Sequence, residues 1–361
     1  MKRYEIDEND DALEPGEVKR KKLLLMNVLA ILQRYTDASH TMTVAQIRDC
    51  LREEYGMEAD RKAIKKNLLD LIAFGYELGY STKTRVQNGK RERILTDWYI
   101  LREFTDAELR LLVDSLLFSK HIPHGQCREL IEKVEGLSSQ YFSQKVRHVR
   151  NMPENLPRNP ELFLTVELLD EAIGLGRQVE FEYCDFGTDK RLHPRKNAKG
   201  EPKKYTVNPY QMVATNGRYY LIGNFDFYDN VGHYRVDRIK HVRLLDTPAK
   251  RAECVRGLEH GLELPTHMAE HIYMFSGECG TVLFRAQKSI VGDILDWFGK
   301  DVRFFDETDG EISVSVRVNY RAMKYWAMQY AYYVTVTSPP RLVEELRGEL
   351  SAAAARYRQD V

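Results

Sequence analysis

Cysteine is scarce in this sequence, and long apolar runs are missing from it. The five cysteines stand far apart and none belongs to a Cys-x-x-Cys pair. Their number and spacing argue against a disulfide framework or a thiolate zinc site, and for a reducing compartment. No apolar stretch approaches the roughly 20 residues of a membrane-spanning helix, and the first residues lack the apolar core of a signal peptide. These absences predict a cytoplasmic protein with no membrane partner.

Net charge is also missing, because 54 Lys and Arg balance 54 Asp and Glu. A uniformly basic nucleic-acid coat is therefore excluded. The distribution is uneven, however: residues 19–104 carry about 17 basic against about 11 acidic side chains, whereas residues 1–18 form an acidic tail. A basic module inside a neutral chain is typical of a protein in which one domain contacts phosphate. A length of 361 residues predicts two or three domains.

The common enzyme signatures are absent as well. The sequence contains no GxxxxGK[ST] phosphate loop, no GxSxG elbow and no GxGxxG after a strand. We therefore expect no bound cofactor and no enzymatic activity.

Residues 19–104 have the element order of a winged helix-turn-helix domain. A helix is predicted over 19–35, and Thr43 with Gln46 forms a capping box for the next helix. A third helix, from Arg61 to Phe74 with Asp60 as its N-cap, has a predicted apolar stripe made of Ile64, Leu68, Leu71 and Ile72. Asn88-Gly89 then joins two strands, because Asn-Gly suits a type I′ hairpin turn.

Basic side chains on the third helix and on the hairpin predict binding to double-stranded DNA. A major groove admits one α-helix, and residues near its N-terminal end read the bases. The alternative is an ordinary solvated helix face, and the basic hairpin beside the helix favours DNA. The predicted DNA-binding residues are Thr43, Arg61, Lys62, Lys65, Lys66, Lys83, Arg85, Lys90, Arg91 and Arg93.

The rest of the chain predicts an α+β protein of several domains. Residues 105–160 are a helical connector that ends in the proline-containing segment 151–160. Short alternating strands over 161–248, with a second Asn-Gly turn at Asn216-Gly217, predict a small antiparallel barrel. A connector over 249–280 follows. Residues 281–361 have the order βαββαβ of a ferredoxin-like module with a closing helix.

The barrel resembles the WYL-domain-containing transcriptional regulator family. The residues that carry the resemblance are the triplet Tyr219-Tyr220-Leu221, with Tyr in the Trp position, the preceding Pro209-Tyr210, the element from Arg235 to Ile239, and the strand Phe181-Glu182-Tyr183. The order of a winged helix, an Sm-like WYL barrel and a C-terminal extension also matches that family. A long basic insertion over 187–204 departs from it.

The resemblance implies that the barrel senses a single-stranded nucleic acid or a nucleotide and transmits its binding to the winged helix of a homodimer. The tyrosines offer stacking surfaces and the arginines offer phosphate contacts. The alternative roles are barrel core for the tyrosines and an ion pair with Asp237 for Arg235. The implied ligand-binding residues are Tyr183, Arg191, His193, Tyr220, Arg235, Asp237 and Arg238.

Two further hypotheses compete with a regulator. In the first, the chain is an accessory that modulates another complex, for example a defence system, by binding nucleic acid through the barrel and the insertion. In the second, His267-Met-Ala-Glu-His271 is the HxxEH pattern of a metallohydrolase, with Glu344 or Glu345 as a distant third ligand. The pattern is short, the other histidines do not cluster in sequence, and a polar connector helix explains it equally well. We therefore predict no metal site.

Overall fold

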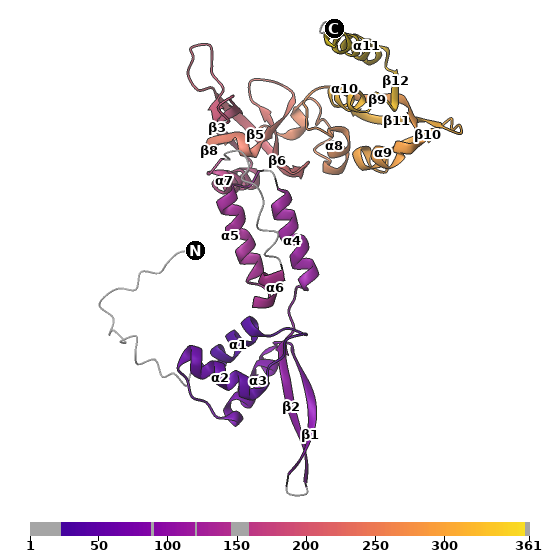
Figure 1. The fold of residues 1–361 in the computed structure, drawn as a ribbon. Helices are drawn as coiled ribbons and strands as arrows, with labels where there is room; N and C mark the ends of the chain where they lie inside the picture. The colour runs from indigo at the N-terminus through magenta and orange to yellow at the C-terminus, as the bar shows by residue number, and fades with distance from the viewer. Residues whose placement is uncertain (1–22, 88–89, 120, 146–158, 358–361) are drawn as a thin grey trace. The chain divides into compact units, whose positions relative to one another are not determined.

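The backbone of the computed structural model forms two compact units. The structure describes residues 23–87, 90–119, 121–145 and 159–357. The predicted acidic tail 1–18 and most of the segment 151–160 therefore lie outside the described residues. One unit contains residues 1–118 and 124–154, and the other contains residues 119–123 and 155–361 (Figure 1). Among the helices of the described ranges, none combines the length and the apolar character that crossing a membrane requires.

The first unit begins with the predicted winged helix. Its buried apolar side chains surround Trp98, which is fully buried, and Met42 pairs with Trp98 through two backbone hydrogen bonds. The hairpin turn at Asn88-Gly89 lies outside the described residues, but Gln87 pairs with Lys90 on either side of it. The elements are α1 (Leu24–Tyr35), α2 (Val44–Tyr55), α3 (Arg61–Phe74), β1 (Leu78–Gln87) and β2 (Lys90–Ile100).

The predicted helix caps are confirmed. The Thr43 hydroxyl accepts from the Gln46 amide while the Gln46 side chain accepts from the Thr43 amide. The Asp60 carboxylate accepts from the Ala63 amide at 2.7 Å. The predicted burial of Ile72 is wrong, because its side chain is 37% exposed. Ile64, Leu68 and Leu71 already fill the face of α3 toward the core, and Ile72 is turned about 100° from Leu71.

Three more helices follow in the same unit, and the third of them contacts the winged helix. The Ser139 hydroxyl donates to the Asp37 carboxylate at 2.8 Å, and the rings of His40 and Tyr141 stack with their centroids 3.7 Å apart. Ser139 and Tyr141 lie at the start of the third of these helices. The helical connector 105–160 is therefore held against the loop that follows α1. The elements are α4 (Asp106–Phe118), α5 (His124–Glu135) and α6 (Gln140–Lys145).

We expect Ser139→Ala to loosen this docking by about 1 kcal/mol, because it removes one half-buried hydrogen bond to a carboxylate. Burial raises the pKa of Asp37, but hydrogen bonds from Ser139, His40 and the Ser39 amide outweigh it and hold the pKa below its ordinary value. A lowered folded-state pKa means that this stabilisation is present above the unfolded-state pKa and is lost as the pH falls through the folded-state value. Below about pH 4 the docking should therefore weaken.

Amide hydrogen exchange of α6 in the full chain measures both effects. The variant should exchange faster near neutral pH and lose protection at a higher pH than the wild type does. Ser115→Ala removes a hydroxyl that donates within α4, to the Leu111 carbonyl, and is the matched control. Equal protection of α6 in both variants would show that Ser139 does not hold the connector.

The second unit begins with the barrel. Helix α7 packs against strands β3, β5 and β8, as Figure 1 shows for its position below the strands. The strand order is β4-β3-β5-β6-β7, with β8 paired to the free edge of β3. Asn216 and Gly217 have φ angles of 52° and 69°, which confirms the predicted hairpin turn. The elements are α7 (Leu162–Leu175), β3 (Arg177–Phe186), β4 (Leu192–Pro194), β5 (Lys204–Thr215), β6 (Arg218–Phe225), β7 (Val231–Arg235), the 3₁₀ turn η3 (Val236–Arg238) and β8 (Ile239–Pro248).

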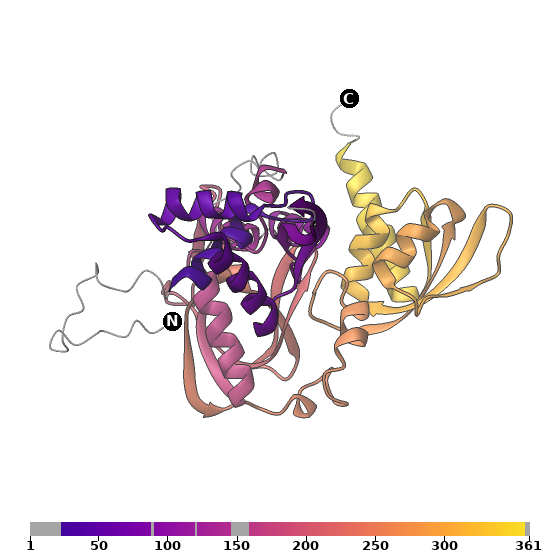
Figure 2. The same ribbon diagram turned by 90° about the horizontal axis from the view of Figure 1, so that it is seen from below.

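The C-terminal part of this unit has the predicted βαββαβ order. Its antiparallel sheet has the strand order β10-β11-β9-β12, which is the ferredoxin-like arrangement. One face of the sheet shares a core with three helices around Trp326 and Phe298, and Figure 2 shows the yellow α11 lying along this domain. The elements are β9 (Cys279–Gln287), α9 (Val291–Phe298), β10 (Arg303–Phe305), β11 (Glu311–Asn319), α10 (Tyr320–Gln329), β12 (Val334–Ser338) and α11 (Pro340–Arg356). The predicted α+β fold class is confirmed.

Candidate nucleic-acid interface and ligand-binding face

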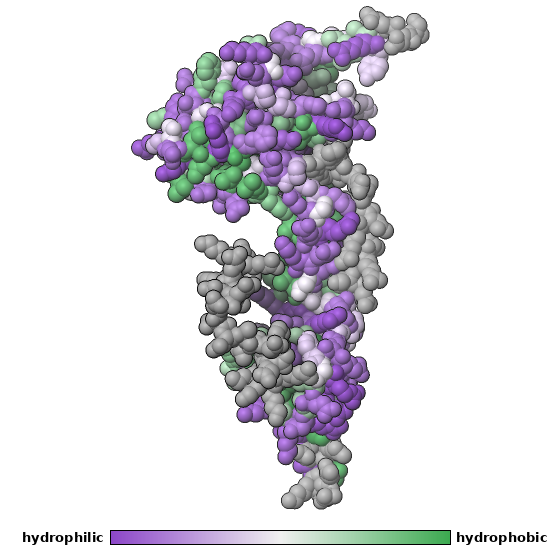
Figure 3. Space-filling model, turned by 90° about the vertical axis from the view of Figure 1, so that its left-hand side faces the viewer, coloured by the Kyte–Doolittle hydropathy of each residue, from purple (hydrophilic) through white to green (hydrophobic). Residues whose placement is uncertain are grey.

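Helix α3 presents its four cationic side chains to solvent. Arg61, Lys62, Lys65 and Lys66 are all exposed, and none of them forms an ion pair with another residue that the structure describes. The opposite side of the helix is anchored by fully buried apolar side chains, so the cations are held outward by the core itself. The described surface around this domain, near the bottom of Figure 3, is mainly hydrophilic.

The hairpin of β1 and β2, which we call the wing, supplies further cations, and one of them is paired with a carboxylate. Lys83 Nζ lies 3.1 Å from Asp97 Oδ2, and the Ser81 hydroxyl bonds to the same carboxylate. Arg91 and Arg93 are exposed. The side chains of Arg85 and Lys90 lie outside the described residues.

Thr43 has a different role from these cations, because its hydroxyl forms hydrogen bonds with Gln46 in the capping box of α2. These hydrogen bonds explain the presence of Thr43 without any contact to DNA. Contact between Thr43 and DNA stays a prediction.

In the barrel, Tyr183 of β3 and Arg235 at the end of β7 come together although β5 and β6 separate their strands in the sheet order. The Arg235 amide donates to Tyr183 Oη at 3.0 Å. Burial raises the pKa of the Tyr183 phenol, which stays neutral and can accept this bond. The centroid of the Tyr183 ring lies 5.5 Å from that of Tyr234 and 6.2 Å from that of Tyr205, both in edge-to-face geometry. These three rings form an aromatic cluster between β3, β5 and β7.

Arg235 and Asp237 form a bidentate ion pair. Arg235 Nη2 lies 2.6 Å from Asp237 Oδ2, and Arg235 Nε lies 3.0 Å from Asp237 Oδ1. The side chains are 17% and 6% exposed. Although burial lowers the pKa of Arg235, hydrogen bonding to Asp237 outweighs it and the net shift is upward. This geometry favours the structural role that the sequence left open for Arg235.

Arg238 belongs instead to an exposed cluster around Asp185. The Asp185 carboxylate accepts from Arg238 Nη1 at 3.0 Å and from Arg195 Nε at 2.7 Å. The Arg195 guanidinium lies over the Tyr183 ring, 4.9 Å from its centroid, and Lys203 Nζ lies 4.9 Å from the centroid of Tyr205. We call Tyr183, Asp185, Arg195, Lys203, Tyr205 and Arg238 the barrel face.

Four residues of the barrel face were missing from the predicted ligand site: Asp185, Arg195, Lys203 and Tyr205. Asp185 follows two residues after Tyr183 on β3, so strand alternation could have found it. Arg195 and Lys203 were noted only as part of the insertion 187–204. Their closeness depends on the pairing of the insertion back onto itself, where the Lys203 amide donates to the Arg195 carbonyl at 2.6 Å.

The remaining predicted ligand residues lie elsewhere. Tyr220 is buried in an apolar cluster with Val213, Ile222 and Leu258, which favours the core role that the sequence also allowed. His193 Nε2 lies 2.9 Å from the Asp189 carboxylate in the hairpin between β3 and β4. Arg191 is exposed in the same hairpin.

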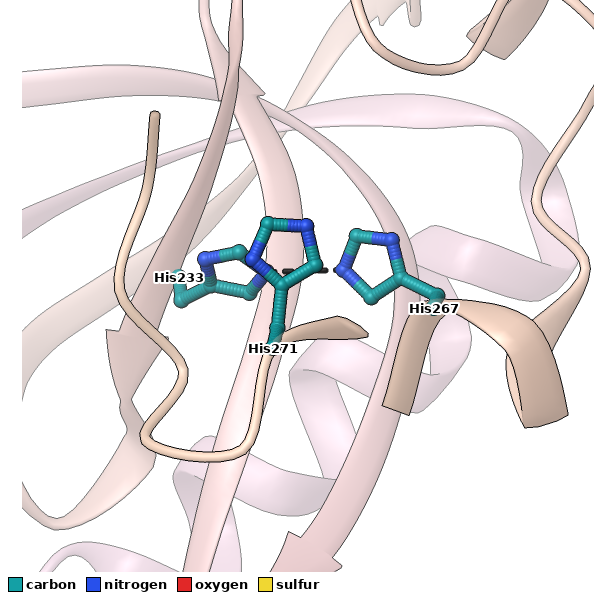
Figure 4. A group of neighbouring side chains, drawn as sticks. All are labelled: His233, His267 and His271. Carbon is teal, nitrogen blue, oxygen red and sulfur yellow. Dashed lines mark hydrogen bonds between the residues drawn. The ribbon is translucent and has the colours of Figure 1, made fainter. Parts of the chain in front are cut away.

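The HxxEH segment contains the short connector helix that the sequence also allowed, but its two histidines are buried. Its helix, α8 (Leu264–Glu270), buries His267, and His271 directly after it is buried too. Both imidazoles meet His233 of β7, so the statement that the other histidines do not cluster is wrong in space (Figure 4). Glu344 and Glu345 are paired with Arg347 and with Arg341, as is typical of a solvated helix, and are not part of this cluster.

Two family models match this chain. The model of the WYL domain matches residues 165–244, and the model of the WCX domain matches residues 280–354. The first match covers α7 and most of the barrel, and the second covers the ferredoxin-like module. None of the curated proteins compared with the chain matches it.

Two solved structures are similar over most of the chain. Proteasome accessory factor B/C (PafBC) of Arthrobacter aurescens is 17% identical with a TM-score of 0.28 over 96% of this chain, which spans about half, 52%, of the PafBC chain. A CRISPR Cas-related protein is 14% identical with a TM-score of 0.36, over 94% of this chain and 86% of its own. At these TM-scores neither likeness establishes a shared overall fold, and the domain assignment rests on the two family models.

Proposed function

We propose that this chain, which carries a WYL domain and a WCX domain, is a transcriptional regulator that binds double-stranded DNA through α3 and the wing. We further propose that its barrel binds a nucleic acid or nucleotide-like ligand and thereby changes the affinity for DNA. A ligand acts in this way only if it binds two conformations with different affinity. Such a regulator needs no catalytic step of its own.

One observation carries the DNA-binding proposal: four cations stand exposed and unpaired, among the described residues, on the first half of α3. Side chains near the N-terminal end of a recognition helix are those that reach base edges, and flanking cations neutralise phosphates. Two copies of the chain, paired as a homodimer, would place two such helices on half-sites about one turn of DNA apart.

The barrel face supports the ligand part of the proposal. Arg195 and Arg238 share one carboxylate, Asp185, so the cluster keeps a net positive charge. A phosphate oxygen can replace that carboxylate on either guanidinium, since planar donors bind both groups alike. The rings of Tyr183 and Tyr205, each 7% exposed, lie beneath Arg195 and Lys203, so a base can stack on them once those cations move aside to bind its phosphate.

Titration of binding against salt tests the DNA proposal. Wild-type protein should bind a duplex from its own upstream region at least about 10³-fold more tightly than random duplex, with an affinity that falls steeply as salt rises. A stronger preference for single strands, without sequence dependence, would contradict operator binding. That outcome would favour an accessory that binds nucleic acid through the barrel face, which is the second candidate function because stacked rings and cations suit single strands.

A further inference from the structure

Three imidazoles from two separate elements converge in the second unit. His233 comes from β7, His267 from α8, and His271 from the residue that ends α8 (Figure 4). The ring nitrogens that each residue offers lie within 4.8 Å of one another. His267 and His271 are four residues apart, so they share a helix face, as in helical metal-binding pairs.

The hydrogen bonds of the rings leave nitrogen lone pairs pointing inward. His271 Nδ1 lies 2.8 Å from the Phe275 carbonyl oxygen. Because a carbonyl can only accept, His271 Nδ1 carries the proton and His271 Nε2 carries a lone pair, which accepts from the Cys279 thiol at 3.4 Å. His233 Nδ1 lies 3.4 Å from the Ser276 hydroxyl, which can donate or accept and therefore orients this ring without fixing its tautomer. Outer partners of this kind are what metal-ligating histidines have in proteins.

The distance between the facing nitrogens of His233 and His267 is close to the distance that a small cation requires. His233 Nε2 and His267 Nε2 are 2.8 Å apart, which forces one imidazole to donate to the other when nothing lies between them. A tetrahedral zinc ion with Zn–N bonds of 2.0–2.1 Å holds its nitrogens about 3.3 Å apart. Opening the pair by about 0.5 Å, through small rotations of the two rings, is therefore enough to admit the ion.

The Glu270 carboxylate lies within 4.8 Å of a ring nitrogen of His271 and favours its protonated form, but burial of the rings acts in the opposite direction. Burial lowers the pKa of all three histidines, that of His267 to about 3. The nearest carboxylate, Glu270, is paired with Arg317 at 2.7 Å.

We propose that His233, His267 and His271 form a binding site for a divalent transition metal ion, with zinc as the expected occupant. Imidazole nitrogens suit zinc, and nearly complete burial of two ligands indicates a structural role. Cys279 Sγ lies 3.4 Å from His271 Nε2 and is the nearest group to the remaining position. Because Glu270 is held by Arg317, the site lacks the general base that an HxxEH hydrolase needs.

The bound ion would fasten the connector 249–280 to the barrel. His233 lies two residues before Arg235 on the same strand, and β9 of the ferredoxin-like module begins eight residues after His271. One ion would therefore cross-link the WYL domain to the segment that leads into the WCX domain. This proposal does not rest on DNA binding or on a ligand of the barrel face.

The test is a zinc titration of the full chain without a polyhistidine tag, stripped with chelator and returned to metal-free buffer. We expect one equivalent of zinc to bind and to raise the thermal midpoint. His267→Gln should lower the affinity for zinc by more than about 100-fold and abolish the rise in the midpoint. His260→Gln, at an exposed histidine of the same connector, should bind zinc as the wild type does.

Cobalt gives a readout that does not depend on the variants folding. Co²⁺ added to the stripped wild-type chain should give the intense visible bands of tetrahedral coordination at one equivalent, and zinc should displace it. Weak octahedral bands, or zinc binding that His260→Gln reduces as much as His267→Gln does, would overturn the proposal. The three rings would then be a neutral hydrogen-bonded core.

Discussion

The double variant Arg61→Ala/Lys65→Ala is expected to lose roughly 30-fold or more of its affinity for the specific duplex. Contacts of this type contribute about 1–3 kcal/mol each, so two of them contribute about 2–6 kcal/mol. Both side chains are exposed and lie away from the apolar core of α3, so the variant should fold as stably as the wild type. The measurement is a fluorescence anisotropy titration at several salt concentrations.

A matched control removes the same charge elsewhere in the same unit. Arg128 and Lys133 are exposed on α5, and Arg128→Ala/Lys133→Ala should leave the specific affinity within about threefold of the wild type. If the contacts of Arg61 and Lys65 are to phosphate, the dependence of log affinity on log salt should also become shallower by about two. Equal losses in both double variants would mean that charge alone, and not α3, sets the binding.

The second large effect is expected from Asp237→Ala, which should destabilise the barrel by about 3–5 kcal/mol. The substitution leaves the Arg235 guanidinium, itself only 17% exposed, without its bidentate partner. Removing one member of a buried pair costs far more than the pair contributes, because a buried charge is left uncompensated. Amide hydrogen exchange of β7 and η3 in the full chain, together with calorimetry, measures the loss.

Asp185→Ala is the comparison, because the same residue type there is 48% exposed and pairs with two arginines at the surface. Asp185→Ala should lower the free energy of unfolding by about 1 kcal/mol or less. If Asp237→Ala costs no more than Asp185→Ala, the pair is not structural and Arg235 is available for a ligand. In that case Arg235→Ala is expected to remove the ligand response while leaving DNA binding without ligand unchanged.

The sequence predicted well those features that a few neighbouring residues determine. A capping box at Thr43 depends on Gln46 alone, and the turn at Asn216 depends on Gly217, so both follow from local chemistry. The order of elements in the ferredoxin-like module followed from periodicity in the same way. Ile72 was assigned wrongly because it lies at the margin of the apolar stripe of α3, and periodicity alone does not say how far burial extends around a helix.

Features that depend on distant pairing could not be predicted. His233 is 34 residues from His267, and only the register of β7 and the path of the connector bring the two rings to 2.8 Å. The same is true of Arg195, which follows β4, and Arg238, which ends η3; the two meet at Asp185 of β3. Composition shows that such residues are present, but no spacing in the sequence shows that they are neighbours.

The hydrogen bond between Ser139 and Asp37 and the stacking of His40 on Tyr141 join residues about 100 positions apart in sequence. An excised DNA-reading fragment that stopped after the wing would lose both attachments and leave Asp37 open to water. A minimal fragment for structural or binding work should therefore extend through Lys145. In the intact chain, strain arriving along the connector would reach α1 and its neighbouring loop before it reached the wing.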